Sequence, residues 1–495
     1  MLQNTYTWIK QHPGDLIKWS IFLLLIYSPI FIDLDVLPLR IWDEARLAES
    51  ALEMYKHGSY LVPHIQGVPD MWSVKPPLMI WLQVLFMKLL GTGELAVRLP
   101  SALAAMFTCI LVMFYCLKYL KNFWWGFGSA LVILTSHGYM WMHASRSGDY
   151  DTLMSFFITL YCLSFYAYSL TVRNKFITIT FLGIILAALT KGIAGLLFLP
   201  ALILFALVKG LVPQLLKNKV FYINIFAFLI VFIGYYLLRE HYNPGYIKTV
   251  LQDEWGGRYL SVIEGHDGSF WFYYENFLDF QFSYWYLFLL AGIVIGLANK
   301  NMAVRDFTLF LTILISVFFL IISLSATKVI WYDVPMYPFM GLIIGGLLPL
   351  IMGLAEKIEK AASLKTYSLQ YLSIALLFIS PYRTILGETY KPDESPIENQ
   401  FYSVGHLLQN AVRGTISLDN YHFYYKGYSI QDLFYINILN DRGAKITITD
   451  EPNFSNGDQI LVCQEPVEDA LLNKYNCYLI DSIQNVKEYQ ILTVK

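Results

Sequence analysis

Residues 122–145 read NFWWGFGSALVILTSHGYMWMHAS, a stretch without a single Asp, Glu, Lys or Arg. About 20 apolar helical residues cross the hydrocarbon core of a membrane, because each residue adds about 1.5 Å along the helix axis and the core is about 30 Å thick. The stretch is therefore long and apolar enough for one membrane-spanning helix. It is apolar on every side, whereas the strands of a membrane β-barrel alternate, so the sequence excludes a barrel.

Ten further charge-free runs occur along the chain. The 495 residues include 35 Lys and Arg and 37 Asp and Glu, which would interrupt an evenly mixed chain about every seven residues. The charges are instead clustered between apolar runs, and this pattern predicts an all-α polytopic membrane protein with about eleven transmembrane helices. The other runs are 19–32, 99–117, 152–172, 176–190, 192–208, 220–238, 280–299, 307–327, 334–355 and 366–382.

The composition excludes several other classes of protein. Hydrophobic residues make up 56% of the chain and aromatic residues 17%, which rules out an intrinsically disordered protein. The formal net charge is −2, so the chain lacks the basic surface that binds nucleic acid. We expect membrane lipids around the protein and no nucleic-acid partner.

The charges of the short loops predict the orientation in the membrane. If the N-terminus is cytoplasmic, every cation-rich loop lies on the cytoplasmic side, as the positive-inside rule requires, and the C-terminus lies outside. The outward turns then carry the single cations Arg146, Lys191 and Lys328. The cations on the cytoplasmic side are Lys10, Lys18, Lys118, Lys121, Arg173, Lys175, Lys209, Lys217, Lys219, Lys300, Arg305, Lys357, Lys360 and Lys365.

Three long segments fall on the outer side: a first loop at 38–97, a second loop at 239–278 and a polar tail at 384–495. We expect a transmembrane domain at 1–383 and a small α/β extracytoplasmic domain at 384–495. The tail has strand-like runs at Ala444–Ile448, Gln459–Val462 and Cys477–Ile480, and a helix near Gln400–Val412. Its two cysteines, Cys463 and Cys477, can form a disulfide or stay free, and the sequence leaves both options open.

A short helix begins at Trp42-Asp43-Glu44 in the first outer loop. Its apolar stripe contains Leu47, Ala51, Met54 and Tyr55, and Gly58 is a plausible stop. The helix is too short and too charged to cross a membrane, so we expect it to lie along the membrane surface. Asp43 has two interpretations: it caps the helix, or it is a general base at the bilayer surface, with Glu44 as a second carboxylate.

Lys75 stands directly before Pro76-Pro77. A residue before proline is held in an extended conformation, so the ammonium group is presented to the membrane interface, where an anionic headgroup is the expected ligand. The alternative is a lysine that extends to the interface and anchors a surface helix.

Five ordered motifs resemble the polyprenyl-phosphate-sugar-dependent glycosyltransferases of glycosyltransferase family 39, which include protein O-mannosyltransferases and lipid A aminoarabinose transferases on the GT-C membrane fold. The resemblance runs from about residue 40 to 340. The motifs are Trp42-Asp43-Glu44-x-Arg46, Lys75-Pro76-Pro77-Leu78-x-x-Trp81, Arg98-Leu99-Pro100-Ser101-Ala102, Ala188 to Gly192, and Thr327 to Pro338. The second outer loop is also similar, with Gly256-Gly257-Arg258 followed by Gly265-His266-Asp267-Gly268.

The resemblance implies transfer of a sugar from a polyprenyl phosphate carrier to an acceptor on the outer face, the acceptor being a lipid, glycan or protein. It implies that Asp43 is the base that deprotonates the acceptor, with Glu44 beside it. The leaving phosphate requires fixed cations. The candidate phosphate ligands are Arg46, Lys75, Arg258, Lys328 and Lys191, with Tyr332 as a neutral donor.

Asp151 matches a family acidic position, so it either orients the acceptor or a cation, or caps the following span, and Asp149 is the alternative at that position. Lys191 binds phosphate or extends to the membrane surface. Asp149, Arg146 and His266 are candidate substrate-binding residues.

No cofactor is assigned from the sequence. Many relatives have Glu before Lys-Pro-Pro, and Val74 stands there in this chain, so a divalent metal site is doubtful and none is predicted. The alternatives to a glycosyltransferase are a flippase of lipid-linked saccharides and an oligosaccharide ligase or polymerase with the same carrier. The compact tail favours a bacterial inner membrane.

Overall fold

The computed structural model describes residues 13–141, 143–363, 367–483 and 485–495, so Lys10 and Lys365 lie outside the described residues. The chain forms two compact units. The helical unit comprises the chain up to Ile32, Pro69–Met79 and Leu99–Tyr390. The mixed unit comprises Asp33–Val68, Ile80–Arg98 and Lys391–Lys495.

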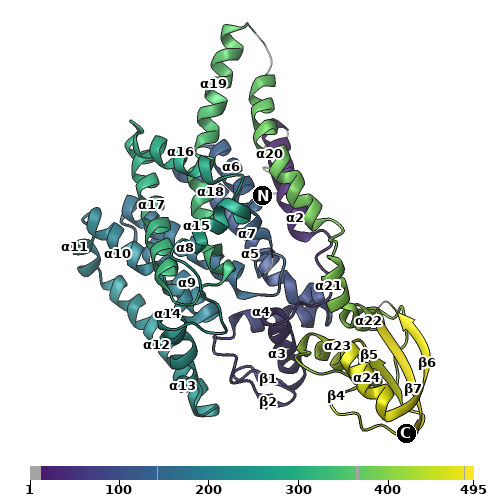
Figure 1. Ribbon diagram of the computed structural model, residues 1–495. Helices are drawn as coiled ribbons and strands as arrows, with labels where there is room; N and C mark the ends of the chain where they lie inside the picture. The colour runs from purple at the N-terminus through teal and green to yellow at the C-terminus, as the bar shows by residue number, and fades with distance from the viewer. Residues whose placement is uncertain (1–12, 142, 364–366, 484) are drawn as a thin grey trace, which may run out of the picture. The chain divides into compact units, whose positions relative to one another are not determined.

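Most of the chain is helical, and Figure 1 shows its elements in order. In the first half of the chain, the described helices are α2 (Pro13–Phe31), α3 (Asp43–His57), α4 (Leu78–Leu90), α5 (Glu94–Tyr115), η1 (Cys116–Leu120), α6 (Phe123–Leu134), α7 (His137–Met140), α8 (Tyr150–Thr171), α9 (Asn174–Lys191), η2 (Gly192–Leu196), α10 (Leu199–Val208), α11 (Val212–Leu216) and α12 (Lys219–Tyr242). The second half begins with α13 (Tyr246–Val250), η3 (Leu251–Trp255), α14 (Gly257–Leu260), α15 (Phe272–Asn276), η4 (Phe277–Gln281), α16 (Tyr286–Leu297), α17 (Met302–Leu324), η5 (Ile330–Met336), α18 (Tyr337–Gly345), α19 (Leu347–Ala361) and α20 (Ser368–Thr389).

Within the described residues, seven helices are long and apolar enough to cross a membrane. An eighth candidate is the pair Phe272–Gln281 and Tyr286–Leu297, which is bent by 113° at its break. The protein is therefore a multi-pass membrane protein, and the count of eleven spans stays a prediction. The seven are Glu94–Leu120, Tyr150–Thr171, Asn174–Leu196, Lys219–Tyr242, Met302–Leu324, Ile330–Ala361 and Ser368–Thr389, and the shorter apolar helices are Leu16–Phe31, Leu78–Leu90, Phe123–Leu134 and Leu199–Val208.

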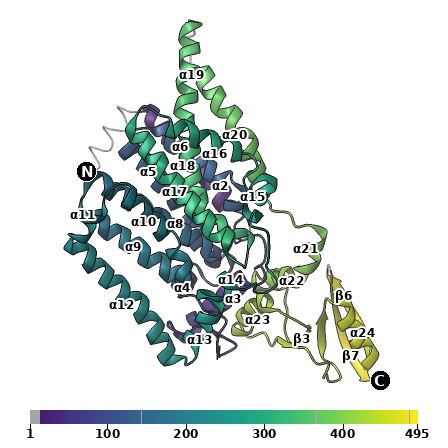
Figure 2. The same cartoon turned by 60° about the vertical axis from the view of Figure 1, so that its left-hand side comes forward.

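The helices of the helical unit pack closely where small residues meet. A Cβ added at Gly345 of α18 would lie 2.5 Å from the backbone nitrogen of Ser129 in α6, so only glycine permits this approach. The Trp125 indole of α6 donates a hydrogen bond to the Leu342 carbonyl at 2.8 Å. Small residues at such crossings let membrane helices approach closely, as in other membrane proteins. Helix α12 differs, because only 11% of its most apolar window is buried, as expected of a helix that faces lipid. Figure 2 shows α12 beside α9.

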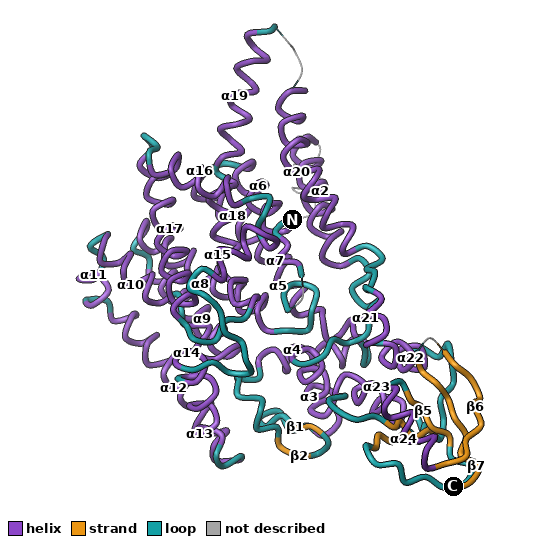
Figure 3. The backbone as a smooth tube through the Cα atoms, viewed as in Figure 1, coloured by secondary structure: helices purple, strands orange, loops and turns teal. Residues whose placement is uncertain are grey.

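The mixed unit contains the expected α/β tail. Its helices after residue 390 are α21 (Pro396–Phe401), α22 (Ser403–Val412), α23 (Ile430–Asp441) and α24 (Glu465–Lys474). The five-stranded sheet has the order β4-β3-β5-β7-β6 and is drawn in orange in Figure 3. Its strands are β3 (Tyr421–Tyr424), β4 (Thr447–Thr449), β5 (Gln459–Val462), β6 (Tyr475–Ile483) and β7 (Val486–Val494), and a two-stranded hairpin, β1 (His64–Ile65) and β2 (Val68–Pro69), lies earlier in the chain.

Strand β3 pairs in parallel with β4 and β5, and the pairs β5–β7 and β6–β7 are antiparallel. Helix α24 packs on this sheet through Val467 and Leu471, which share a buried cluster with Ile460 and Val462 of β5. Strand β5 has the predicted bounds, and β4 and β6 overlap the other two predicted strands. All five cysteines are free, so Cys463 and Cys477 are not joined by a disulfide.

Helix α3 confirms the helix predicted after Trp42. It ends at Gly58, which has φ 73° and donates its N–H to the Met54 carbonyl at 2.9 Å. A left-handed glycine is the usual end of such a helix. Most of α3 between Glu44 and Met54 is buried, and it packs against α23 of the same unit.

Candidate functional site

A cavity of about 260 Å³ lies within the helical unit. Its lining combines basic and acidic side chains and two tyrosines with an apolar wall. Four candidate spans, a strap before α4 and the loop between α12 and α15 all contribute. The lining residues are Lys75, Asp151, Met154, Lys191, Ile193, Ala194, Leu197, Glu254, Arg258, Tyr259, Phe318, Ile321, Ile322, Ser325 and Tyr332.

The structure brings five of the predicted site residues together in this cavity: Lys75, Asp151, Lys191, Arg258 and Tyr332. They come from positions that span more than half of the chain. Their charges and polar groups face the same space as the apolar residues. Such a lining suits a molecule with an anionic group attached to a hydrocarbon chain.

Asp151 and Lys191 form a buried ion pair. Lys191 is the last residue of α9, Asp151 lies in the first turn of α8, and the Lys191 Nζ lies 2.7 and 2.6 Å from the two carboxylate oxygens of Asp151. The capping residue of α8 is Asp149, whose carboxylate accepts a hydrogen bond from the Tyr150 N–H at 2.6 Å. Asp151 is therefore not the cap of α8, and Lys191 ends on a buried carboxylate rather than at a surface.

Lys75 lies at the end of a strap, residues 70–75, which has no helix or strand and turns at 71–72. Its Nζ lies 3.7 Å from Oε1 of Glu254 and 5.2 Å from the centre of the Tyr150 ring. Two residues that are not among the lining residues donate hydrogen bonds to the backbone of the strap. The Tyr246 hydroxyl donates to the Val74 carbonyl at 2.8 Å, and Arg239 Nη2 donates to the Asp70 carbonyl at 3.2 Å.

Arg239 is fully buried at the end of α12. Its guanidinium lies 4.3 Å from the centre of the Tyr246 ring and donates to the Tyr235 hydroxyl at 3.3 Å. A buried cation requires such hydrogen bonds and ring contacts to offset its loss of hydration. Neither Arg239 nor Tyr246 was a predicted site residue, because their partners in the strap lie about 170 residues away in the sequence.

Arg258 and Tyr332 are hydrogen-bonded to each other. Arg258 Nη1 donates to the Tyr332 hydroxyl at 3.1 Å, and the Lys191 Nζ lies 5.4 Å from the centre of the Tyr332 ring. The tyrosine therefore lies between two cations. Gly257 allows the turn before Arg258, because a Cβ there would lie 1.9 Å from the Gln252 carbonyl oxygen.

Glu254 is a cavity residue outside the set of site residues predicted from the sequence. Its Oε1 lies 3.7 Å from Lys75 and 3.8 Å from Nε of Arg258. The spacing of four residues between Glu254 and Arg258, which is typical of an ion pair on a helix, was the available signal.

Lys328 and His266 are not among the residues that line the cavity. The Lys328 Nζ donates to the carbonyl of Ser325 at 2.5 Å, and Ser325 is itself a lining residue. Exposed His266 accepts a hydrogen bond from the Lys328 N–H through its carbonyl at 2.9 Å. These contacts fix the loop beside the cavity, and the predicted phosphate and substrate contacts of both residues stay predictions.

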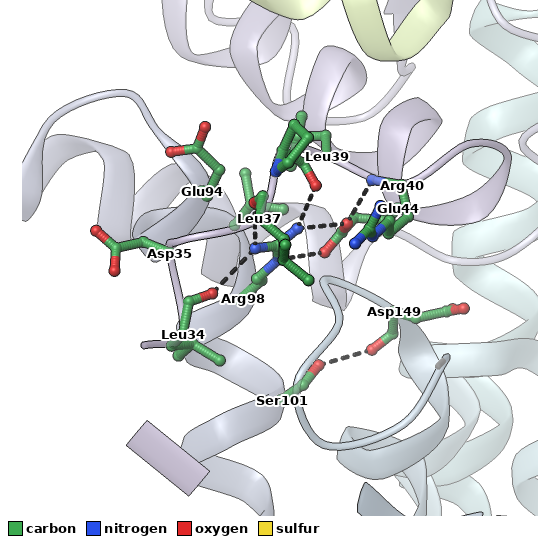
Figure 4. Close-up of polar contacts among 12 residues, drawn as sticks. Leu34, Asp35, Leu37, Leu39, Arg40, Glu44, Glu94, Arg98, Ser101 and Asp149 are labelled. Atoms are coloured by element: carbon green, nitrogen blue, oxygen red, sulfur yellow. Dashed lines mark hydrogen bonds and ion pairs between the residues drawn. The ribbon is translucent and has the colours of Figure 1, made fainter. Parts of the chain in front are cut away.

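Arg146 and Asp149 have structural partners within the helical unit. Arg146 donates to the carbonyls of Pro29, Ile30 and Thr389 at 2.9 to 3.2 Å. The His143 ring nitrogen Nδ1 lies 2.5 Å from the Asp149 carboxylate. The Asp149 carbonyl accepts from Ser101, as Figure 4 shows.

In the mixed unit, Glu44 forms a buried ion pair with Arg98. Arg98 Nε and Nη2 lie 2.8 and 3.0 Å from its two carboxylate oxygens, and the Arg40 N–H also donates to Glu44 at 2.7 Å (Figure 4). The remaining donors of Arg98 bind the carbonyls of Leu34, Leu37 and Pro38. Glu44 thus fixes the start of α3, and proton transfer by Glu44 would require this pair to break.

Asp43 is the first residue of α3 rather than its cap. The cap position is Trp42, which has φ 70° and makes no side-chain cap hydrogen bond, and the N–H groups of Ala45 and Arg46 donate to the carbonyls of Arg40 and Trp42. The capping interpretation of Asp43 is therefore wrong. Asp43 and Arg46 are both half-buried and are three residues apart, so they share one face of the helix. Their predicted roles as base and phosphate ligand stay predictions.

Residues 74–236 match the family model described as dolichyl-phosphate-mannose-protein mannosyltransferase. An uncharacterized protein of Aquifex aeolicus (strain VF5) is 27% identical over 61% of this chain and 58% of its own length. The undecaprenyl phosphate-alpha-4-amino-4-deoxy-L-arabinose arabinosyl transferase 1 of Proteus mirabilis (strain HI4320) is 24% identical over 66% of this chain and 58% of its own. The chain thus spans 58% of the length of these relatives.

Two solved structures share the fold. ArnT from Cupriavidus metallidurans, bound to undecaprenyl phosphate, has a TM-score of 0.71 at 15% identity and covers 97% of this chain and 98% of that one. The oligosaccharyltransferase AglB from Archaeoglobus fulgidus has a TM-score of 0.52 at 11% identity, covering 98% and 75%. The predicted resemblance to glycosyltransferases of the GT-C fold is confirmed.

Proposed function

We propose that this protein is a membrane glycosyltransferase that moves a sugar from a polyprenyl phosphate carrier, such as undecaprenyl phosphate, to an acceptor hydroxyl or phosphate. The cavity carries this proposal, because its lining joins Lys75, Lys191 and Arg258 to an apolar wall. A lipid phosphate has the matching combination of charge and hydrocarbon. The names of the arabinosyl transferase relatives and of the ArnT complex support the same donor.

In the proposed reaction, an acceptor oxygen attacks the anomeric carbon of the sugar. A bond from that oxygen to the anomeric carbon forms, the bond from the carbon to the carrier phosphate breaks, and its electron pair stays on the phosphate oxygen. The acceptor proton goes to a base. Lys75, Lys191 and Arg258 offset the charge that develops on the leaving phosphate, and the Tyr332 hydroxyl is a neutral hydrogen-bond donor.

We propose Asp43 as the base, on the match of its motif. Its carboxylate is half-buried and does not cap α3. Asp151 is a carboxylate of the cavity, and its pairing with Lys191 suits a positioning role better than proton transfer.

The proposed setting is a bacterial inner membrane with the N-terminus in the cytoplasm. The transmembrane domain would be 1–383, with eleven spans, and the tail 384–495 would be extracytoplasmic together with the site. Loop charges and the isolated cations support this arrangement.

Purified protein incubated with a radiolabelled undecaprenyl-phosphate sugar and a membrane lipid extract tests the proposal. Release of sugar-free undecaprenyl phosphate together with a labelled acceptor is expected. Movement of intact donor across a vesicle membrane without its cleavage would instead identify a flippase and contradict the proposal.

A further inference from the structure

Glu254 places a negative charge among the cations of the cavity. Its carboxylate side chain is 13% exposed, and it lies 3.7 Å from Lys75 and 3.8 Å from Arg258. These distances exceed those of ordinary N–H···O hydrogen bonds, which are about 2.7–3.2 Å. Glu254 therefore acts on both cations by its charge rather than through close hydrogen bonds.

The neighbouring charges of Glu254 come from several elements. Lys75 faces it from the strap and Arg258 from α14, while Asp151 and Lys191 add a second, closely paired acid and base to the same lining. Because Asp151 is paired with Lys191 at hydrogen-bond distance, it mainly offsets that lysine. Glu254 is thus the lining carboxylate that lies near both Lys75 and Arg258, and it reduces the positive charge that the two cations offer to a bound anion. Glu264 also lies 3.9 Å from Arg258, but it is not among the lining residues.

The donor and the product of the proposed reaction differ in charge. A sugar joined to a polyprenyl phosphate is a phosphodiester with one negative charge. Breaking the bond to the sugar leaves a phosphate monoester, which carries about −1.5 to −2 at pH 7, since its second pKa is about 6. A fixed carboxylate in the cavity repels the second form more strongly than the first.

We propose that Glu254 makes the cavity prefer the monoanionic donor over the more highly charged product and so speeds release of the spent carrier. This inference rests on the proposed function. It assigns to Glu254 a role in the preference between donor and product and in product release.

Binding measurements in lipid nanodiscs test the proposal. The dissociation constants of undecaprenyl phosphate and of a sugar-bearing undecaprenyl phosphodiester are compared for the wild type and Glu254→Gln at pH 7.5. We expect the ratio of the product's dissociation constant to the donor's dissociation constant to be about tenfold lower in Glu254→Gln than in the wild type. The change should shrink at pH 5.5, where the product carries little more than one charge.

Kinetics give a second readout. With the product bound more tightly, steady-state turnover of Glu254→Gln should fall, while the rate of a single turnover should not. Glu254→Asp keeps the charge and should keep the wild-type preference. Glu254→Ala is a second neutral variant and should shift the preference in the same direction as Glu254→Gln. The test therefore still works if one of the two variants does not fold.

Glu264→Gln is the matched control. Glu264 lies 3.9 Å from Nη2 of the same Arg258, but it is half-exposed and is not among the residues that line the cavity. An equal change in both dissociation constants of Glu254→Gln, or a change no larger than that of Glu264→Gln, would overturn the inference. Failure of the wild type to bind either lipid would instead overturn the proposed function.

Discussion

Asp43 and Glu44 are adjacent acids with different environments. Glu44 is 1% exposed and held by Arg98, whereas Asp43 is half-buried at the first position of α3. Neighbouring residues of a helix point about 100° apart, so a single residue of difference directs one carboxylate into the protein and leaves the other accessible. This difference allows the proposed base to be tested separately from its neighbour.

Asp43→Asn should lower turnover by a factor of about 10² to 10⁴, the usual contribution of a general base, and leave carrier binding and folding intact. The amide has the shape of the carboxyl group but does not take the proton. Single-turnover rates and carrier affinity are the measurements. Turnover close to wild type would remove Asp43 from the mechanism. A loss of folding in Glu44→Gln but not in Asp43→Asn would confirm the structural role of Glu44.

Lys75→Ala should weaken carrier binding by about 1.5–3 kcal/mol, the range for a hydrogen bond to a charged group, and should also slow transfer. Lys75→Gln should lose most of the same affinity, because an amide carries no charge. Titration of undecaprenyl phosphate measures the effect. Lys88→Ala is the control, since Lys88 donates to the Tyr60 hydroxyl and does not line the cavity. Wild-type affinity in Lys75→Gln would contradict the role in phosphate binding.

Glu49 of α3 gives the mixed unit a pH dependence. Burial, and then the charge of Glu53, raise the pKa of the Glu49 carboxyl from 4.5 to about 7. A raised pKa means that the folded state holds the proton more tightly than the unfolded state. The stability that this proton provides is fully present below about pH 4.5 and is lost as the pH rises through about 7. Burial raises the pKa of Asp432 in the same unit to about 7 as well.

Glu49→Gln should therefore be more stable than the wild type at pH 8, by roughly 3 kcal/mol, since each pKa unit corresponds to about 1.4 kcal/mol. At pH 4.5 the two proteins should be nearly equal, because the wild-type carboxyl is then protonated in the folded state. Thermal unfolding followed between pH 4.5 and 8 measures the difference. A constant difference across this range would contradict the assignment to Glu49.

Among the elements, the strap at residues 70–75 shows what the sequence predicts and what it does not. The Pro76-Pro77 pair predicts that Lys75 is extended and presented to the membrane interface. The structure places Lys75 outside any helix, at a bend, with its side chain 12% exposed in the cavity lining. The residues that hold the strap, Arg239 and Tyr246, belong to a distant part of the chain. Local patterns carry no information about such contacts, so they could not be predicted.

Tyr246→Phe removes a single hydrogen bond to the strap and keeps the ring beside Arg239. We expect weaker carrier binding, by about 0.5–1.5 kcal/mol, and a smaller effect of this change when Lys75 is already alanine. A double-mutant cycle measures this coupling. Tyr382→Phe is the control, because its hydroxyl also donates to a backbone carbonyl, that of Leu25 at 3.0 Å, and Tyr382 does not line the cavity. Full additivity with Lys75→Ala would show that Tyr246 does not act through the strap.

The helices themselves were predicted to different degrees. Charge-free runs overlap the seven candidate spans of the described residues, because charges are excluded from hydrocarbon. The run at 122–145, predicted as one spanning helix, is divided instead: α6 ends at Leu134 as a shorter apolar helix, and the separate helix α7 follows it. No separate helix was predicted at 78–90, where α4 forms a shorter apolar helix within the predicted first outer loop. Residues 176–190 and 192–208 were predicted as two spans, but one candidate span continues through Lys191 to Leu196. The charge of Lys191 is tolerated inside that segment because Lys191 is paired with the buried carboxylate of Asp151.

The predicted orientation of the protein in the membrane can be tested by chemical labelling. A cysteine at exposed Asp419, in a variant that lacks the five native cysteines, should react with an impermeant thiol reagent in intact spheroplasts. A cysteine at exposed Lys360 should react only after the membrane is opened. Mass spectrometry of the labelled protein gives the readout. Protection of the site at Asp419 would reverse the proposed placement of the tail.

The mixed unit also has a consequence for how the protein is made. It is assembled from Asp33–Val68, Ile80–Arg98 and Lys391–Lys495, so roughly 300 residues must be synthesised between its second and third parts. About 370 residues separate the end of α3 from the start of α23, so at about 5–20 residues per second α3 waits on the order of 20 to 75 seconds for its partner. During this time the ribosome is still delivering the spans, and the apolar side of α3 has no α23 to pack against. We expect the membrane surface to cover this apolar side until the last hundred residues arrive.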